Sequence, residues 1–513
     1  MNRLFIFFIF FLLAIFLNKT SFAHNVEDRH ELTSILQDTD QEPGLEYRDR
    51  IEGEVEDPDH EDLLAGHVEA PIWTVIPFIA LLLMIATGPL FYEHFWHKNY
   101  HLIAIFLALI VVGYFIFILH NVHAPIHALA EYIPFISLLG ALYIASGGIA
   151  IKIDKKSAPI TNTAILIIGA MVSNLIGTTG ASMLLIRPYI KLNKGNVKPY
   201  HIVFFIFMVS NIGGSLTPIG DPPLFLGFLK GIPFFWTLQH NIMPWTCALI
   251  FLAIVFYFID KNSAKDDYLL DDAPPVYTNK VSILGARNFI WLALVIAFVF
   301  IDPNVFEWVP YIPYGGQKIS FIKEVVWLGV AFFSFKLASK RALASNDFSF
   351  EPIREVAFIF IGIFGTMMPA LEIVGNFAQS DAGASLITHN SLYWGTGLLS
   401  GFLDNAPTYL SFLAAAMASQ GASISVLHDV SIFASGGFYD HSVLDLKAIS
   451  IAAVFFGALT YIGNGPNFMV KSISEQIGIK MPSFFGYMIR YSIPVLMPLL
   501  ILIWLIFFAF QPI

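Results

Sequence analysis

Long apolar runs alternate with short polar connections from about residue 72 to the end of the chain. Most of these runs approach the roughly 20 residues that an α-helix needs to cross a bilayer. The pattern therefore predicts an all-α polytopic membrane protein with about 10 spans and two hairpins. The predicted uninterrupted spans lie at residues 72–91, 100–119, 129–150, 233–259, 288–301, 324–339, 355–373 and 484–510.

Four further apolar segments contain Gly, Pro, Asn or Asp at positions that disfavour a continuous helix. Segment 160–186 has basic residues on both flanks, so the positive-inside rule places both of its ends in the cytoplasm. Segment 390–418 has no Lys or Arg in either flank, and both of its ends are predicted to be periplasmic. We therefore expect two re-entrant hairpins that enter from opposite sides, whereas segments 200–229 and 447–473 are predicted to be broken spans.

The order of these segments indicates two inverted repeats. Residues 217–223 (TPIGDPP) match residues 460–466 (TYIGNGP) at the Thr, Ile, Gly and final Pro. Residues 173–174 of the first hairpin are interpreted as the equivalents of residues 404–405 of the second. Chance similarity between turn-rich segments is the alternative, and the opposite predicted sides of the hairpins argue against it. Inverted repeats with paired broken helices are typical of secondary transporters, whose site lies near the bilayer midplane.

The polar segments and the net charge complete the domain organisation. The first residues have the charged start, short apolar core and small-residue end of a signal peptide, with an uncleaved first span as the alternative. The net charge of −10 comes mainly from the acidic segment that follows, and the single cysteine, Cys247, excludes an intrachain disulfide. The predicted domains are a signal peptide (1–23), an acidic periplasmic tail (24–70), the first transmembrane repeat (71–260), a cytoplasmic linker (261–287) and the second transmembrane repeat (288–513).

The broken segments carry two carboxylates, Asp221 and Asp404, and no basic residue at the breaks. An ionisable group at membrane depth is a functional candidate by default. A buried carboxylate can bind either Na⁺ or a proton, because the two compete for its charge. Asp404 is the first candidate for this exchange and Asp221 the second, and the alternative roles are turn stiffening by Asp404 and helix capping by Asp221. Other candidate ion-binding residues with oxygen-bearing side chains are Ser173, Asn174, Thr178, Thr217, Asn405, Thr408, Thr460 and Asn464.

Hard cations prefer oxygen ligands, and Asp404, Asn405 and Asn174 are the predicted core of a Na⁺ site. A carrier for an organic anion must instead compensate its substrate's negative charge, with bound cations, helix N-termini or basic side chains. Two acids without a base therefore favour a cation. Each Asn or Thr taken singly is also a common turn residue.

Four stretches of the chain resemble signature stretches of NhaD-type sodium/proton antiporters, within the larger ion transporter superfamily. They are SNLIGTTGASMLLIRP, SNIGGSLTPIGDPPLFLGFLKG, LDNAPTYL and GALTYIGNGPNFMVKSI, and the resemblance covers most of residues 70–513. It implies an elevator-type movement of a transport domain against a scaffold that forms a homodimer. The superfamily also contains citrate, dicarboxylate and arsenite carriers, so the resemblance indicates the fold more directly than the substrate.

The sequence therefore predicts a secondary transporter that exchanges Na⁺ or Li⁺ for H⁺ across the bacterial inner (cytoplasmic) membrane, with a periplasmic N-terminal tail. We expect no enzymatic activity, no cofactor apart from the transported ions, and no nucleic-acid partner, because no phosphate loop, nucleophile–histidine pair or basic patch is present. The alternatives are a sodium-coupled organic-anion (citrate or dicarboxylate) or oxyanion carrier of the same fold, and an ion channel or membrane receptor.

Overall fold

The structure is a computed structural model that describes most of the chain after the predicted tail. The predicted signal peptide and all of the acidic tail except Ala70 lie outside the described residues. The described residues belong to one compact unit. They are 70–155, 157–193, 196–267, 280–303, 306, 308–314, 317–437 and 441–511.

Three helices open the first half, at the first three predicted spans. A 3₁₀ turn, η3 (Ile72–Val75), leads into α5 (Ile76–Phe91). The next two helices are α6 (Glu93–Phe117) and α7 (His123–Gly147). Both begin several residues before the predicted spans, because polar residues outside the apolar run continue the helix.

The helix α8 (Pro159–Leu192) is a helical hairpin. Gly177 has φ 78° and ψ 154°, a backbone conformation that the missing Cβ permits and that ends the first arm. Asn162 and Asn193, 31 residues apart, each donate a hydrogen bond to the other's side-chain oxygen, at 2.9 and 3.0 Å. The arms therefore run antiparallel and their outer ends meet, as predicted for segment 160–186. We call this element hairpin 1.

The next segment is a broken helix, as predicted. It comprises α9 (Pro199–Met208), a 3₁₀ turn η4 (Ile212–Gly214), a non-helical stretch, and α10 (Pro222–Lys230). The sequence predicts the break at residues 217–223, but it is wider, because the chain leaves α9 already before Asn211, which has φ −139° and ψ −85°. Asp221 is extended, since a proline follows it and disfavours the helical conformation.

A small sheet joins the two halves. The helix α11 (Trp236–Asp267) continues past the predicted end of its span into the predicted linker. The strand β2 (Lys280–Leu284) also lies in that linker and pairs antiparallel with β1 (Ala150–Asp154), which precedes hairpin 1. No strand is predicted from the sequence at either place, because a short strand with a distant partner leaves no local periodicity.

The second half repeats the order of the first. Hairpin 2 consists of α17 (His389–Ser400) and α18 (Asn405–Ser419), joined by residues 401–404. Gly395 of the first arm lies against Phe412 of the second. The elements before it are α12 (Asn288–Val299), β3 (Ile312–Tyr314), β4 (Gln317–Ile319), α13 (Ile322–Lys336), α14 (Lys340–Ser345), α15 (Glu351–Ala378) and α16 (Asp381–Ala384).

A second broken helix follows hairpin 2. After α19 (Leu427–Ser435), the chain forms α20 (Ser442–Phe456), a 3₁₀ turn η5 (Gly457–Leu459) and, beyond the break, α21 (Gly465–Gln476). The last predicted span consists of α22 (Phe484–Tyr487), a π-helical segment η6 (Met488–Leu496) and α23 (Met497–Phe507).

The two breaks have the same tight geometry. A Cβ on Gly220 would lie 2.0 Å from the Gly214 carbonyl oxygen, and a Cβ on Gly463 would lie 2.6 Å from that of Gly457. Both glycine pairs have the same spacing, and both come just before the Asp or Asn that begins the next helix. The backbone approach in each break therefore excludes a side chain at these positions, and this supports the predicted repeat.

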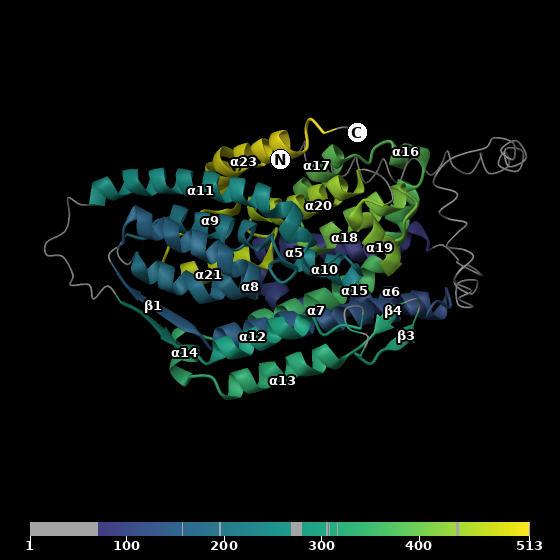
Figure 1. The fold of residues 1–513 in the computed structure, drawn as a ribbon, viewed down its shortest axis with the longest axis horizontal. Coiled ribbons are helices and arrows are strands. Elements are labelled where there is room, and N and C mark those ends of the chain that lie inside the picture. The colour runs from purple at the N-terminus through teal and green to yellow at the C-terminus, as the bar shows by residue number, and fades with distance from the viewer. Residues whose placement is uncertain are drawn as a thin grey trace, which may run out of the picture. The chain divides into compact units, whose positions relative to one another are not determined.

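The surface and the length of the helices fit a bilayer. By length and composition, seven helices in the described part of the chain could span one, and one of these, α8, folds back as hairpin 1. The helices α6 and α13 expose large apolar side chains such as Leu102, Phe106 and Leu328, whereas residues 201–208 of α9 are all buried. Figure 1 shows β1, before hairpin 1, and α16, before hairpin 2, at opposite ends of the bundle. The predicted class, an all-α polytopic membrane protein, is confirmed.

Candidate functional site

Asp221 is the point where both hairpins and both breaks meet. Its side chain is 1% exposed. One carboxylate oxygen accepts hydrogen bonds from Thr178 Oγ1 at 2.7 Å and Asn464 Nδ2 at 3.0 Å. The other accepts one from Asn405 Nδ2 at 2.6 Å. Three of the predicted ion-binding residues, from three separate segments, therefore surround a fourth.

Each of these residues stands at the start of a helix. Thr178 begins the second arm of hairpin 1, Asn405 is the first residue of α18, and Asn464 precedes α21. Asp221 itself precedes α10, whose first residue is proline. Helix N-termini carry partial positive charge, so four of them converge on one carboxylate.

No full positive charge among the described residues balances Asp221. Among the described residues, no Lys, Arg or His donates a hydrogen bond to it, and its three donors are neutral. The most deeply buried Lys and Arg side chains among the described residues are engaged elsewhere. These are Lys230 with Glu131 (2.5 Å), Lys323 with Asp302 (2.5 Å) and Arg187 with Asp347 (3.4 Å). The site can therefore be neutralised by a proton or a bound cation.

Asp404, the first candidate from the sequence, lies at the tip of hairpin 2 and has a different environment. It is half-buried, and its Oδ1 accepts a hydrogen bond from the Ala406 backbone N–H at 3.0 Å, which caps α18. It does not bond to Asp221, but the next residue along the chain, Asn405, does. The structure thus places both acids in one region, with Asp221 at the junction and Asp404 beside it.

The other predicted site residues bond to the backbone around the breaks. Thr217 donates to the Asn174 carbonyl and Thr460 to the Gly401 carbonyl, each at 2.6 Å, so each broken helix is tied to its own hairpin. The side-chain oxygen of Asn174 accepts the Leu216 N–H at 2.9 Å. Ser173 and Thr408 also donate to backbone carbonyls, those of Val209 and Asp404.

Comparison with known proteins identifies the family. A family model described as "Putative citrate transport" matches residues 67–508, which is most of the chain. The chain belongs to this citrate-transport family. No curated protein matches the chain.

Membership in the citrate-transport family, together with the apolar helices, makes the protein a multi-pass membrane transporter. The narrower likeness to NhaD-type antiporters is not confirmed by this match and stays a prediction. The transported substrate therefore has to be argued from the site itself, because related folds carry different substrates.

The pairing of the two hairpins inferred from the sequence is wrong by one helical turn. That pairing aligns Asp404-Asn405 with Ser173-Asn174, but Thr178 and Asn405 are the residues that occupy equivalent places. Both begin the second arm of a hairpin, and both donate to Asp221. The residue equivalent to Asp404 is therefore Gly177. Sequence comparison misses this because a glycine and an aspartate share no side-chain chemistry.

Two asparagines of the site are not among the residues predicted from the sequence. Asn211 Nδ2 donates to Asn467 Oδ1 at 2.7 Å, which links the two broken helices directly. Asn467 Nδ2 in turn donates to the backbone carbonyls of Gly457 and Thr460, which lie at the break in the helix. Both side chains are 0% exposed. An amide within an apolar run, beside a predicted break, is the signal that could have identified them.

Proposed function

We propose that the protein exchanges Na⁺ or Li⁺ for H⁺ across the bacterial inner membrane. The observation that carries this proposal is the environment of Asp221, a buried carboxylate with three neutral donors and no basic partner among the described residues. Burying an unpaired carboxylate is costly, so the group takes up either a proton or a cation. Exchange requires a site of this kind, which binds a proton and a cation alternately.

The two acids at the helix N-termini of the site argue against a carboxylate substrate as the only cargo. An anion would be attracted to those positive ends, but two of the four already carry the protein's own acids, Asp221 before α10 and Asp404 before α18. A tricarboxylate placed there would meet like charges at close range. A cation meets attraction instead.

Oxygen ligands for a small cation are available beside Asp221. Asn405 and Asn464 donate through Nδ2, and their side-chain oxygens accept no hydrogen bond from any described residue. The second carboxylate oxygen of Asp404 is similarly unused. With the two acids and carbonyls from the breaks, these groups could approach the six or so oxygens that a hard cation prefers. Asn174 fits this role less well than the sequence suggests, because its oxygen already accepts the Leu216 N–H.

Transport requires the site to face each side of the membrane in turn. We propose that the hairpins and broken helices move together against the helices α5, α6, α7, α12, α13 and α15, in the elevator-type movement that the family resemblance implies. The tie between each hairpin and its own broken helix supports their movement as one body.

A second candidate function is citrate transport coupled to a bound cation, and it is favoured by the family match. Here the cation at Asp221 and Asp404 would compensate part of the citrate charge. This reading predicts that a cation gradient alone moves no protons unless citrate is present.

Inside-out vesicles with an acid interior and a pH-sensitive dye test the two functions. We expect Na⁺ to dissipate the pH gradient without citrate, and Asp221→Asn to lower the rate at least about 100-fold, because the exchangeable charge is lost. The control is Asp381→Asn, an exposed acid in α16, outside the hairpins and the broken helices. A gradient that responds only when citrate is added would overturn the exchange proposal in favour of citrate transport.

A further inference from the structure

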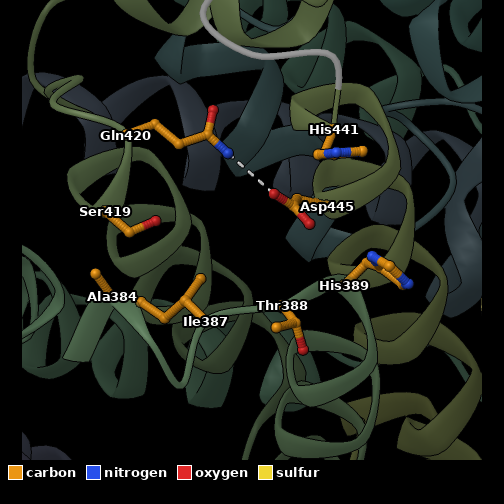
Figure 2. Close-up of a pocket in the computed structure, with 8 residues that line it drawn as sticks. All are labelled: Ala384, Ile387, Thr388, His389, Ser419, Gln420, His441 and Asp445. Atoms are coloured by element: carbon orange, nitrogen blue, oxygen red, sulfur yellow. Dashed lines mark hydrogen bonds between the residues drawn. The ribbon is translucent and has the colours of Figure 1, made fainter. Parts of the chain in front are cut away.

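A polar cavity of about 220 Å³ lies at the base of hairpin 2, away from the breaks (Figure 2). The cavity lies where α17 begins and α18 ends, against the first turn of α20. Ala384 at its rim is exposed, so the cavity reaches the surface of the protein. Its lining residues are Ala384, Ile387, Thr388, His389, Ser419, Gln420, His441 and Asp445.

Asp445 gives this cavity a buried negative group. Asp445 is 6% exposed. One of its carboxylate oxygens accepts a hydrogen bond from Gln420 Nε2 at 3.0 Å. Figure 2 shows this bond and the second oxygen turned away from Gln420. No described residue donates to that second oxygen, and Gln420 Oε1 is buried without a partner. The cavity therefore holds two oxygen atoms with unused acceptor capacity.

The chemistry of the lining selects the class of ligand. The carboxylate of Asp445 and the amide oxygen of Gln420 are hard oxygen ligands, which suit a small alkali cation. The hydroxyls of Thr388 and Ser419 bond within their own helices instead. The described residues contain no group of three His, Cys, Asp or Glu that could hold a metal ion, so the lining does not fit a tightly held transition metal. His389 is held by the Phe508 carbonyl, 3.1 Å from its Nε2.

The helix that carries Asp445 leads to the proposed exchange site. Asp445 stands in the first turn of α20, which ends at the second break, about 18 Å further along at 1.5 Å per residue. Ser450 on α20 and Thr396 on α17 come between the cavity and the break along these two helices, and both residues are buried. The Thr396 hydroxyl has no hydrogen-bond partner among the described residues. Buried polar groups therefore occur along the helices that lead from the cavity to the site.

We infer that this cavity is an antechamber that binds the alkali cation on its way between Asp221 and the side of the membrane where hairpin 2 begins. The inference rests on the proposed function for the identity of the cargo. Binding in the cavity itself can be measured without transport.

Cysteine protection tests the antechamber directly, since the chain has one cysteine. In the full-length protein with Cys247→Ser, we introduce Ser419→Cys and measure its modification by a membrane-impermeant thiosulfonate reagent. We expect Na⁺ to slow modification at least about fivefold relative to choline, because a bound ion occupies the cavity. Asp445→Asn should remove the protection, whereas the surface variant Asp381→Asn should retain it.

A third variant separates the cavity from the central site. Protection should persist in Asp221→Asn, since that substitution leaves the cavity intact; loss of protection there would show that Na⁺ acts from the central site and would overturn the antechamber. Absence of protection in the Ser419→Cys protein, protection that survives Asp445→Asn, or an introduced thiol that is never modified would overturn it too. Protection without any Na⁺-driven proton movement would leave the antechamber standing and reject the exchange function.

Transport kinetics give a second, independent measurement. We expect Asp445→Asn to raise the half-saturating Na⁺ concentration about tenfold when Na⁺ is added on the side of hairpin 2, and to leave it within about twofold on the other side. An equal effect from both sides would assign Asp445 a structural role instead.

Discussion

The two breaks at the centre of the protein have the same backbone conformation at the residue before the next helix, but they differ in charge. Asp221 and Asn464 both precede a helix in the same extended conformation, with φ −144° and −154°. Asp221 stands where the second repeat has Asn464, and Gly177 stands where it has Asp404. Each repeat therefore supplies one carboxylate, but at inequivalent positions.

This difference has a direct physical reason. Asn464 Nδ2 lies 3.0 Å from an oxygen of Asp221, so an acid at both positions would bring two negative charges into contact. The amide of Asn464 donates a hydrogen bond to Asp221 instead, and the second acid, Asp404, lies at the tip of hairpin 2. The repeated backbone thus sets where polar groups meet, and the unequal side chains set the charge of the site.

The largest effect is expected from moving the acid to the equivalent position. Asp221→Asn should lower Na⁺-driven proton movement at least about 100-fold. The double variant Asp221→Asn/Asn464→Asp should recover about tenfold of that loss, because the side chains of residues 464 and 221 lie 3.0 Å apart and the exchange returns one negative charge to the junction. Initial rates in vesicles measure both. No recovery would show that the surroundings of Asp221, and not only its charge, are needed.

Asp404→Asn should have a smaller effect on binding and a distinct effect on charge movement. Asparagine is also a good helix cap, so the fold should persist. We expect the half-saturating Na⁺ concentration to rise about tenfold. If both acids release protons, wild-type exchange responds to membrane potential and the variant does not. A valinomycin-imposed potential checks this, and an unchanged voltage response would exclude Asp404 from the proton count.

The smallest effects should come from the threonines that tie each break to its hairpin. Thr460→Val leaves the Gly401 carbonyl and the Gly463 N–H without their partner, and should lower stability by about 1–3 kcal/mol. Thr217→Val removes the equivalent bonds but should cost less, because Thr217 is only half-buried and water can replace them. Thermal unfolding in detergent compares the two variants. A greater loss of stability for Thr217→Val would contradict this argument from burial.

The sequence alone was sufficient for the elements that depend on local chemistry. Apolar runs of membrane length predicted the spans, and Gly and Pro beside polar residues predicted both hairpins and both broken helices, because these residues act on their own backbone. The acids at the breaks were visible for the same reason. The strands β1 and β2 were not predicted, since their pairing joins distant segments.

Only the tertiary structure decided which side chains meet. The sequence ranked Asp404 first, but the packing of four segments puts Thr178, Asn405 and Asn464 around Asp221. It also aligned Ser173 with Asp404, where the structure places Gly177, and it gave no sign that Gln420 and Asp445 would share a cavity. Local pattern determines where a helix breaks, but the partners of the residues at that break are set by how distant segments pack.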